Sequence, residues 1–239
     1  MKRYLLILAA FLLLASPLYA SAAIAFDAGD TVTTCSSVSS CSFSHTIGST
    51  KPNEILFVFA LTTNNDASAT YNGVAMTKIA SQVETNDGRT ISLFVLAGPT
   101  AGAHNIVISG TGTETLIRGM GASYSGALQS NTVDASIASH NDASVSSFTT
   151  TLTTLAIGDW AVLGVRQTGG VNTGGIAAGT NMNFRTNDTF DAIGDNNSAI
   201  TPAGSYSITV NATTGTGGFY TIMAAFAPAT FAPWQMSDF

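Results

Sequence analysis

The sequence has few charged residues and, after its first 22 residues, no long apolar run. Asp, Glu, Lys and Arg make up 9% of its 239 residues, against roughly a quarter of an average soluble domain. Ser, Thr, Asn and 23 glycines occupy many of the remaining polar positions. Such a composition is typical of exported β-rich proteins, in which hydroxyl and amide side chains cover strands and turns.

Basic residues are especially scarce. Eight Lys and Arg against 14 Asp and Glu give a formal net charge of −6. Two of these basic residues, Lys2 and Arg3, belong to a predicted leader, so the mature chain is more acidic still. Nucleic-acid binding depends on neutralising phosphates with Lys and Arg. The charge balance therefore argues against a nucleic acid as the partner.

Residues 1–22 have the pattern of a secretory signal peptide. Three residues with two basic side chains, MKR, precede an apolar run, Tyr4–Ala15. The small residues of Ala20-Ser21-Ala22 favour cleavage after Ala22. The run is short for a membrane-spanning helix, and no later run is longer. We therefore expect a protein that is secreted or held at the cell surface, or is periplasmic, without a transmembrane segment after cleavage.

The motifs of the common enzyme classes are also absent. The sequence has no GxSxG, HExxH or CxxC motif and no phosphate-binding glycine loop. Glu54, Glu84 and Glu114 fall in separate elements, so no strand carries the paired carboxylates of a glycosidase. His45 and His104 lie in strand-like runs, where ordinary hydrogen-bonded histidines are expected. We expect a non-enzymatic protein.

The sequence has only two cysteines, Cys35 and Cys41. Export would place them in an oxidising compartment, where a disulfide persists. Closing so short a loop would contribute on the order of 2 kcal/mol. A zinc site would need more ligands nearby, and only His45 is close. We therefore predict a disulfide.

Residues 53–109 are rich in strand signals. Ile55–Leu61 is an unbroken apolar run, and Ile91–Ala97 is broken only by Ser92. Ile, Val and Phe in such runs suit a buried pleated surface. Asn72-Gly73 can adopt the positive φ angles of a two-residue type I′ turn. The pattern predicts a meander of antiparallel strands.

A second series of strand-like runs echoes the first. Ser42-Phe43 is followed by Glu54 and an apolar run, as Ser147-Phe148 is followed by Asp159 and WAVLGV. AGAHNIVI, beginning at residue 101, likewise recurs as AGSYSITV from residue 203. Any two sets of alternating strands can look alike, so chance similarity is the competing explanation.

Such an echo is compatible with two tandem sandwiches or with one sandwich built from two similar halves, about 42–127 and 147–229. No linker-like segment separates the halves. We therefore predict one all-β domain over residues 23–229, followed by a C-terminal aromatic tail, 230–239. The expected fold class is an all-β antiparallel β-sandwich with roughly ten to twelve strands.

Five segments carry a resemblance to a known family: SFSHTIG, EILFVFALT, YNGVAMT, RTISLFVLAGPTAGAHNIVIS and MAAFAPA. They resemble a widespread family of uncharacterised exported domains from bacterial, archaeal and phage-associated proteins. The resemblance covers about residues 24–229 and implies a jelly-roll β-sandwich similar to carbohydrate-binding modules and lectins. Its motifs are turns and core strands, so it implies no catalytic residues.

Residues 187–197 form an acidic and amide-rich cluster. Asp188, Asp191 and Asp195 could supply oxygen ligands to calcium, which prefers six to eight oxygens. The spacing is not that of an EF-hand loop, and the same composition is usual in an ordinary surface turn. Both readings, a calcium site at these aspartates and a plain turn, remain open.

A sugar-binding surface would need exposed aromatic side chains beside polar groups. Tyr71, next to the predicted turn, is the best exposed candidate, with Asn72 and Arg89 as polar partners. Trp160 lies in a strand-like run and is expected in the core. The aromatic residues could also simply fill the space between two sheets.

The central strands are apolar on both faces. If one face met water, Leu56, Val58 and Ala60 would be polar. A long loop, the tail or another subunit should therefore cover that second face. The tail carries Phe231, Trp234 and Phe239, which we expect to dock on the chain's own outer face or on a neighbouring subunit.

These features favour a secreted structural, adhesion or extracellular-assembly subunit that self-associates or binds other surface proteins. A carbohydrate-binding, lectin-like module with a glycan partner is the alternative. The sequence predicts no cofactor apart from the candidate calcium.

Overall fold

The computed structural model describes residues 23–49, 51–64, 67–85, 87–169 and 174–229. They form 18 β-strands, so the predicted all-β class is confirmed, although the strands outnumber the ten to twelve expected. Very short strands, such as the two residues of β6 (Val74–Ala75), carry no periodic pattern that a sequence could reveal. Within the described residues no helix is long and apolar enough to cross a membrane. The predicted leader and the tail with Phe231, Trp234 and Phe239 lie outside the described residues.

The first half of the chain forms two facing sheets. The inner sheet has the order β1 (Ala25–Gly29), β10 (Ile117–Ser125), β4 (Ile55–Thr62), β8 (Thr90–Ala97) and β7 (Thr77–Val83), with β2 (Thr33–Cys35) also paired to β10. The outer sheet has the order β3 (Val38–Ile47), β9 (Gly102–Glu114), β5 (Ser68–Tyr71) and β6.

The second half repeats this arrangement. Its inner sheet has the order β11 (Ala135–Val145), β18 (Gly217–Phe226), β13 (Trp160–Thr168), β16 (Asp191–Asp195) and β15 (Asn183–Asn187). Its outer sheet has the order β12 (Ser147–Thr153), β17 (Ser205–Ala212) and β14 (Ile176–Ala178).

Both halves have jelly-roll topology. In each, the first strand pairs antiparallel with the last, β1 with β10 and β11 with β18. The next strand in the facing sheet pairs with the one before the last, β3 with β9 and β12 with β17. This winding is that of a jelly roll, so the predicted antiparallel jelly-roll class is confirmed. Each half, however, builds its own pair of sheets, which corrects the expectation of one sandwich shared between them.

The segments that echo each other in the sequence occupy corresponding strands. Phe43 lies in β3 and Phe148 in its counterpart β12, while Glu54 directly precedes β4 and Asp159 directly precedes β13. Strands β9 and β17, which carry the two AG-initiated segments, also occupy equivalent places. The echo therefore follows the shared topology. Whether the two halves behave as one domain in solution stays a prediction.

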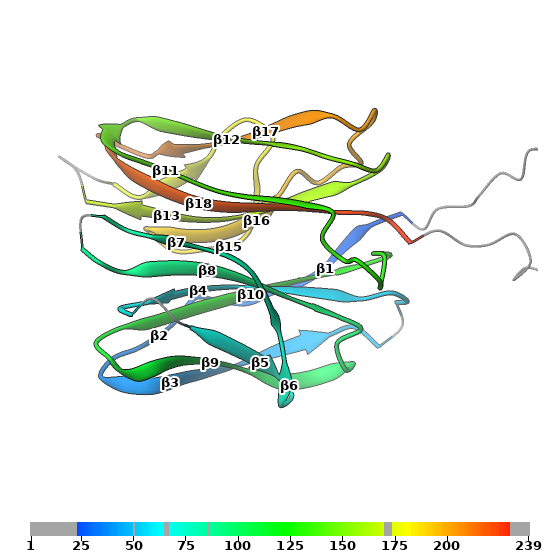
Figure 1. Cartoon of the computed structure of the whole chain (residues 1–239), viewed down its shortest axis with the longest axis horizontal. Helices are drawn as coiled ribbons and strands as arrows, with labels where there is room; N and C mark the ends of the chain where they lie inside the picture. Colours follow the sequence, from blue (N-terminus) through cyan, green and yellow to red (C-terminus); the bar gives the residue numbers. More distant parts are fainter. Residues whose placement is uncertain (1–22, 50, 65–66, 86, 170–173, 230–239) are drawn as a thin grey trace, which may run out of the picture.

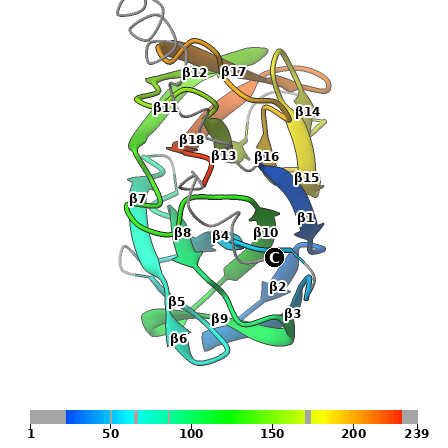
Figure 2. The same ribbon diagram turned by 90° about the vertical axis from the view of Figure 1, so that its right-hand side faces the viewer.

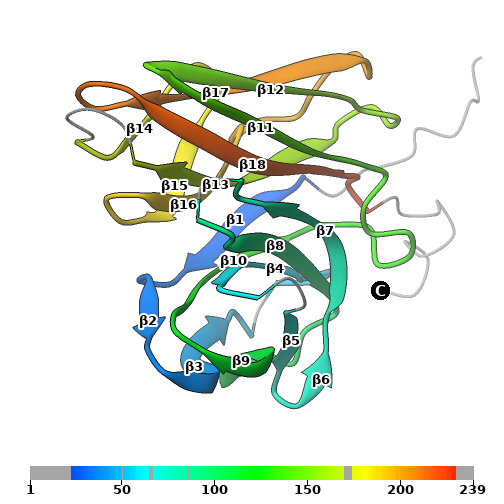
Figure 3. The same cartoon turned by 60° about the vertical axis from the view of Figure 1, so that its left-hand side comes forward.

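The four sheets stack in four layers, with the two inner sheets face to face (Figures 1–3). Blue-to-green strands of the first half form two neighbouring layers, and green-to-red strands of the second half form the other two (Figure 1). An apolar cluster between the inner sheets joins Phe57, Phe59 and Tyr124 to Trp160 and Phe226. The ring centroids of Phe57 and Phe226 lie 5.1 Å apart.

This stacking explains why β4 is apolar on both faces. Leu56, Val58 and Ala60 pack towards the outer sheet of the same half, whereas Phe57 and Phe59 pack against the other half. The second face is thus covered by a sheet of the same chain, not by a loop, the tail or another subunit as expected. Self-assembly draws no support from these two-sided strands.

The predicted tight turn is also present. Tyr71 pairs with Val74 across the hairpin of β5 and β6. Between them Asn72 and Gly73 have φ angles of 51° and 77°, the signs that a type I′ turn requires.

Candidate functional site

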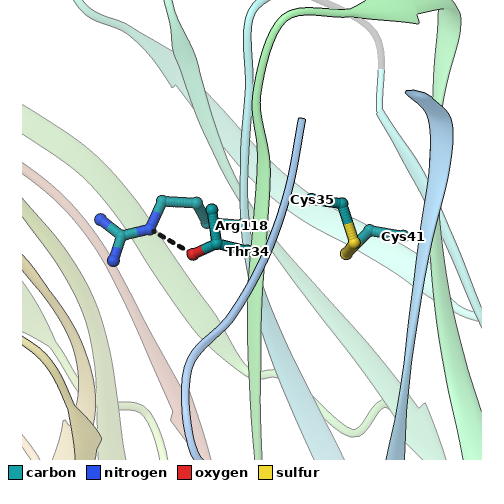
Figure 4. Close-up of a disulfide and its surroundings, with 4 residues drawn as sticks. All are labelled: Thr34, Cys35, Cys41 and Arg118. Atoms are coloured by element: carbon teal, nitrogen blue, oxygen red, sulfur yellow. Dashed lines mark hydrogen bonds between the residues drawn. A yellow bond between two sulfur atoms is a disulfide. The ribbon is translucent and has the colours of Figure 1, made fainter. Parts of the chain in front are cut away.

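Cys35 and Cys41 form a disulfide with a Cα–Cα distance of 5.7 Å. Cys35 ends β2 in the inner sheet, and Cys41 lies in β3 of the outer sheet (Figure 4). The disulfide prediction is confirmed. The bond joins the two sheets of the first half, and the neighbouring Thr34 accepts a 3.3 Å hydrogen bond from Nε of Arg118 on β10.

Charged side chains from both halves meet in an interface charge cluster, which consists of Glu84, Arg118, Arg166, Asp188 and Asp191. Arg118 of the first half forms ion pairs with Asp188 and Asp191 of the second. Arg166 of the second half lies 3.0 Å from both Asp191 Oδ2 and Glu84 Oε1, and Glu84 belongs to the first half. Each half therefore contributes an arginine that pairs with a carboxylate of the other half.

Most of this cluster is dry. Glu84 and Asp191 are fully buried, and Arg166 is 7% exposed. Burial, together with a hydrogen bond to Asp87, raises the pKa of Glu84 to about 8, against the attraction of Arg166. Removing one partner from such a buried group costs far more than the intact pair contributes. The cluster is accordingly a structural joint that depends on every member.

The three aspartates of the candidate calcium site face arginines. Asp195 accepts hydrogen bonds from Arg185 at 2.6 and 2.9 Å. Asp188 Oδ1 accepts the backbone N–H groups of Phe190 and Asp191 at 2.8 and 2.9 Å, the geometry of an ordinary Asx turn. Within the described residues no three His, Cys, Asp or Glu side chains are placed to hold a metal ion. The arrangement favours the turn, and calcium binding stays a prediction.

The candidate glycan residues are not brought together. Tyr71 is fully buried, and its hydroxyl donates to the carbonyls of Thr100 and Gly102 at 3.1 and 3.0 Å. Its exposure was therefore wrongly predicted, because the strand before the turn directs this ring into the core. Asn72 lines a shallow depression with His104 and Asn105, whereas Arg89 pairs with Asp87 beyond β7.

The glutamates singled out in the sequence have three different environments. Glu114 accepts hydrogen bonds from the backbone and side chains of Thr63 and Asn64. Burial alone would raise its pKa, and these bonds outweigh burial and lower it. Glu54 is buried, and neither carboxylate oxygen has a partner among the described atoms. Burial, with repulsion from Asp27, raises the pKa of Glu54 to about 7.

The histidines expected to be ordinary have ordinary partners. Nδ1 of His45 lies 2.7 Å from Oδ2 of Asp30, and Nε2 of His104 lies 3.2 Å from the carbonyl oxygen of Ala101. His45 is almost completely buried. These contacts position strands and loops.

An apolar surface, here called the chain-end patch, lies where the described chain begins and ends. Both ends lie at the same end of the stack (Figure 1). A pocket there is lined mainly by apolar residues: Ala23, Ile24, Ile157, Trp160, Ala199 and Pro228. Leu155, on the same loop as Ile157, completes the patch. Leu155 and Ile157 are each 69% exposed, against 50% for Val74, another exposed apolar side chain.

Sequence reasoning missed both the interface charge cluster and the chain-end patch. A signal for the cluster was present, since Arg118 and Arg166 interrupt otherwise apolar strands. An arginine at such a position is rarely buried without a carboxylate partner. Leu155 and Ile157 stood in a short connection, where no periodicity indicates which side chains are exposed.

The fold and these surfaces define a class of protein, an all-β protein of two stacked jelly-roll sandwiches. No family model matches the chain, and no curated protein matches it. Among solved structures, it is similar to a conserved protein of unknown function, PA5104, from Pseudomonas aeruginosa PAO1. The two are 10% identical with a TM-score of 0.26, covering 88% of this chain and 96% of the other.

Two further structures show similar levels of likeness. The PBSX exported protein XepA is 9% identical with a TM-score of 0.24, covering 82% of this chain and 86% of its own. The major capsid protein P2 of bacteriophage PM2 is 9% identical with a TM-score of 0.24, covering 88% and 98%. Likenesses this weak carry no argument about function, which must come from the chain's own surfaces.

Proposed function

We propose that the protein is a secreted, non-enzymatic structural subunit that self-associates through the chain-end patch. The observation that carries this proposal is the exposure of Leu155 and Ile157 beside an apolar pocket. Large apolar side chains grouped at one site commonly mark an interaction surface. The described chain leaves the fold at the same place, through Pro228 and Ala229.

The use of the charged residues supports a structural role. Arg118 and Arg166 join the two halves, and Arg185 joins two strands of the second half through Asp195. The disulfide joins the two sheets of the first half. These ion pairs and the disulfide therefore hold strands, sheets and halves of the molecule together.

The occupant of the patch, in this proposal, is segment 230–239 of a second copy. This segment begins directly after Ala229 and carries Phe231, Trp234 and Phe239 with one charged residue, Asp238. The side chains that line the patch are uncharged too. Because the described chain ends at Ala229, beside the patch, two copies that exchange the following segments would do so reciprocally, which closes a two-fold dimer instead of a filament.

The area available is sufficient for a dimer. An aromatic side chain buries about 150–250 Å², so three from each of two segments bury roughly 900–1,500 Å². Specific protein interfaces begin at about 1,200 Å² in total. The exchange alone therefore reaches the lower end of that range.

Sedimentation analysis of the mature chain tests the proposal. We expect a dimer, and we expect a chain truncated after Ala229, or one carrying Leu155→Ser and Ile157→Ser, to be monomeric with an almost unchanged melting temperature. Val74→Ser is the matched control, because it removes an exposed apolar side chain from a different surface and should leave the dimer intact.

Two outcomes would overturn this assignment. A mature chain that is monomeric at every concentration would remove self-association. A truncated chain with a much lower melting temperature would show that segment 230–239 belongs to its own subunit's core.

The carbohydrate-binding alternative has less support, because its aromatic platform, Tyr71, is buried. It retains only the depression around Asn72 and His104. A glycan array probed with the mature protein separates the two functions. Binding that is lost in Asn72→Ala would favour the lectin-like module over the structural subunit.

A further inference from the structure

Two carboxylates meet beneath the loop that carries Leu155 and Ile157. The backbone N–H of Ala156 donates to Asp159 Oδ2 at 3.1 Å and to Asp134 Oδ2 at 3.3 Å. The N–H of Leu155 donates to the same Asp134 oxygen at 3.2 Å. Since one N–H group serves both carboxylates, the two side chains lie next to each other under the chain-end patch.

Asp159 is fully buried and Asp134 is half-buried, and no cation is paired with either among the described residues. The Oδ1 atoms of Asp134 and Asp159 are buried without a partner among the described atoms. The segments around the pair, 127–133, 154–158, 196–204 and 217–229, contain no charged residue. Two of these segments are held to the pair by backbone hydrogen bonds, from Ile200 N–H to the Asp159 carbonyl and from Asp134 N–H to the Ala225 carbonyl.

One further titratable group would lie nearby. Cleavage after Ala22 would create an α-amino group on Ala23, which lines the pocket together with Ile157. Such a group titrates at about pH 7.7–8.0. It is not a hydrogen-bond partner of either aspartate in the described structure, so a variant of the aspartates separates its effect from theirs.

Asp159 is fully buried next to a second carboxylate, so its ionisation carries a cost that a proton on Asp159 removes. Asp159 protonated at Oδ2 can donate to Asp134, which then accepts this bond together with the two backbone N–H groups. Burial and the hydrogen bond with Asp134 raise the pKa of Asp159 to about 7. When that proton leaves, two anions face each other with no cation between them.

We propose that Asp134 and Asp159 form a proton-sharing pair that holds loop 154–158 in place, so that the shape of the chain-end patch depends on pH near neutrality. The inference rests on the proposed function, because it describes the regulation of the same patch. Below neutrality the shared proton keeps Leu155 and Ile157 in position. Above it, repulsion between the carboxylates releases the loop and weakens association.

The sign of this pH dependence follows from proton linkage. The folded chain binds this proton more tightly than the unfolded chain, whose aspartate has a pKa of 3.8. The pair therefore contributes stability that is fully present below that value and is lost as the pH rises through about 7. Association that needs the closed loop weakens by at most about tenfold per pH unit for one linked proton.

Backbone NMR of the mature chain tests the pair directly. We expect the amide signals of Leu155 and Ala156 to titrate together with a midpoint near pH 7. In Asp159→Asn the amide can replace the shared O–H as a donor to Asp134, so this titration should disappear. Asp134→Asn, whose amide can donate to the Asp159 carboxylate and which removes the neighbouring negative charge, should move the midpoint well below pH 7, and it guards against one variant failing to fold.

Glu54→Gln is the matched control. Glu54 occupies the equivalent position in the first half, and its pKa is likewise raised to about 7, but it does not contact loop 154–158. Its variant should leave the titration of Leu155 and Ala156 unchanged.

The inference is overturned if these two amides do not titrate in the wild-type chain, or if they titrate equally in both aspartate variants, as the α-amino group of Ala23 would cause. It is also overturned if Glu54→Gln abolishes the titration. The NMR result does not depend on dimer formation. A chain that shows the titration and yet never dimerises would contradict the proposed function and leave the proton-sharing pair in place.

Discussion

The two halves of the molecule have the same strand order and differ in how they are held together. In the first half, a disulfide joins the inner sheet to the outer sheet. The second half has no cysteine and contains the ion pair of Arg185 with Asp195 at the edge of its inner sheet. The carboxylate of Glu54 in the first half has no hydrogen-bond partner among the described atoms, whereas its counterpart Asp159 has a second carboxylate beside it.

This comparison shows which features a repeated topology conserves. The strand order follows from where apolar runs and turns fall in the chain, and both halves retain these. The cross-links involve individual side chains, whose substitution need not change the strand pairing. The two halves can therefore keep the same fold although the first contains a disulfide and the second contains the loop with Leu155 and Ile157.

The largest expected effect breaks the joint between the halves. Replacing Arg166 with Met removes the hydrogen-bond donor of Glu84, which its pKa of about 8 leaves largely protonated at neutral pH. It also takes one of two arginines from the fully buried Asp191. Breaking a buried ion pair from one side costs about 3–5 kcal/mol, so the free energy of unfolding measured in denaturant should fall by that amount.

Arg89→Met is the control for that experiment, because its ion pair with Asp87 lies within the first half and the two side chains are 32% and 36% exposed. We expect it to cost about 1 kcal/mol, as for a solvent-accessible pair. Equal losses in the two variants would show that the interface charge cluster is no special joint.

Loss of the disulfide should have a smaller effect. Cys35→Ser with Cys41→Ser removes the link between β2 and β3 and should lower the free energy of unfolding by about 2 kcal/mol. The hydrogen exchange of strands β3 and β9 should rise, while that of β12 and β17 stays the same. Equal changes in both outer sheets would mean that the link acts on the whole stack.

The buried carboxylate of Glu54 should make the stability of the folded chain depend on pH. Its pKa is raised from 4.5 to about 7 in the folded chain, so wild-type stability should fall as the pH rises through this interval. Glu54→Gln should flatten that fall and be more stable than the wild type at alkaline pH by on the order of 1 kcal/mol. Thermal unfolding across this pH range measures it, and identical curves for the two chains would contradict a buried, unpaired Glu54.

Calcium removal should have the smallest effect. Arginines and backbone N–H groups already occupy the carboxylate oxygens of Asp188, Asp191 and Asp195. Adding EDTA to the purified mature protein should therefore leave its melting temperature unchanged. A clear decrease, restored by added calcium, would establish the cation site that the sequence leaves open.

Several features of the fold could be predicted because they depend on neighbours in the chain. The apolar run of β4 and the Asn72-Gly73 turn are set by local sterics and by burial. The disulfide could be predicted from the two cysteines and the export signal. The candidate sites were less predictable, since Tyr71 beside an exposed turn is itself buried, and the partners of Arg118 lie more than 60 residues away in the chain.

By itself, the amino-acid sequence determined the all-β class, the antiparallel strands and the echo between the halves, because alternation, turns and apolar runs act over a few residues. Only the tertiary structure decided what covers the second face of β4, which carboxylates meet arginines and which meet each other, and where apolar side chains stay exposed. Those outcomes depend on how two sheets distant in sequence face one another, and burial of apolar area is non-directional, so it favours contact without specifying the partner.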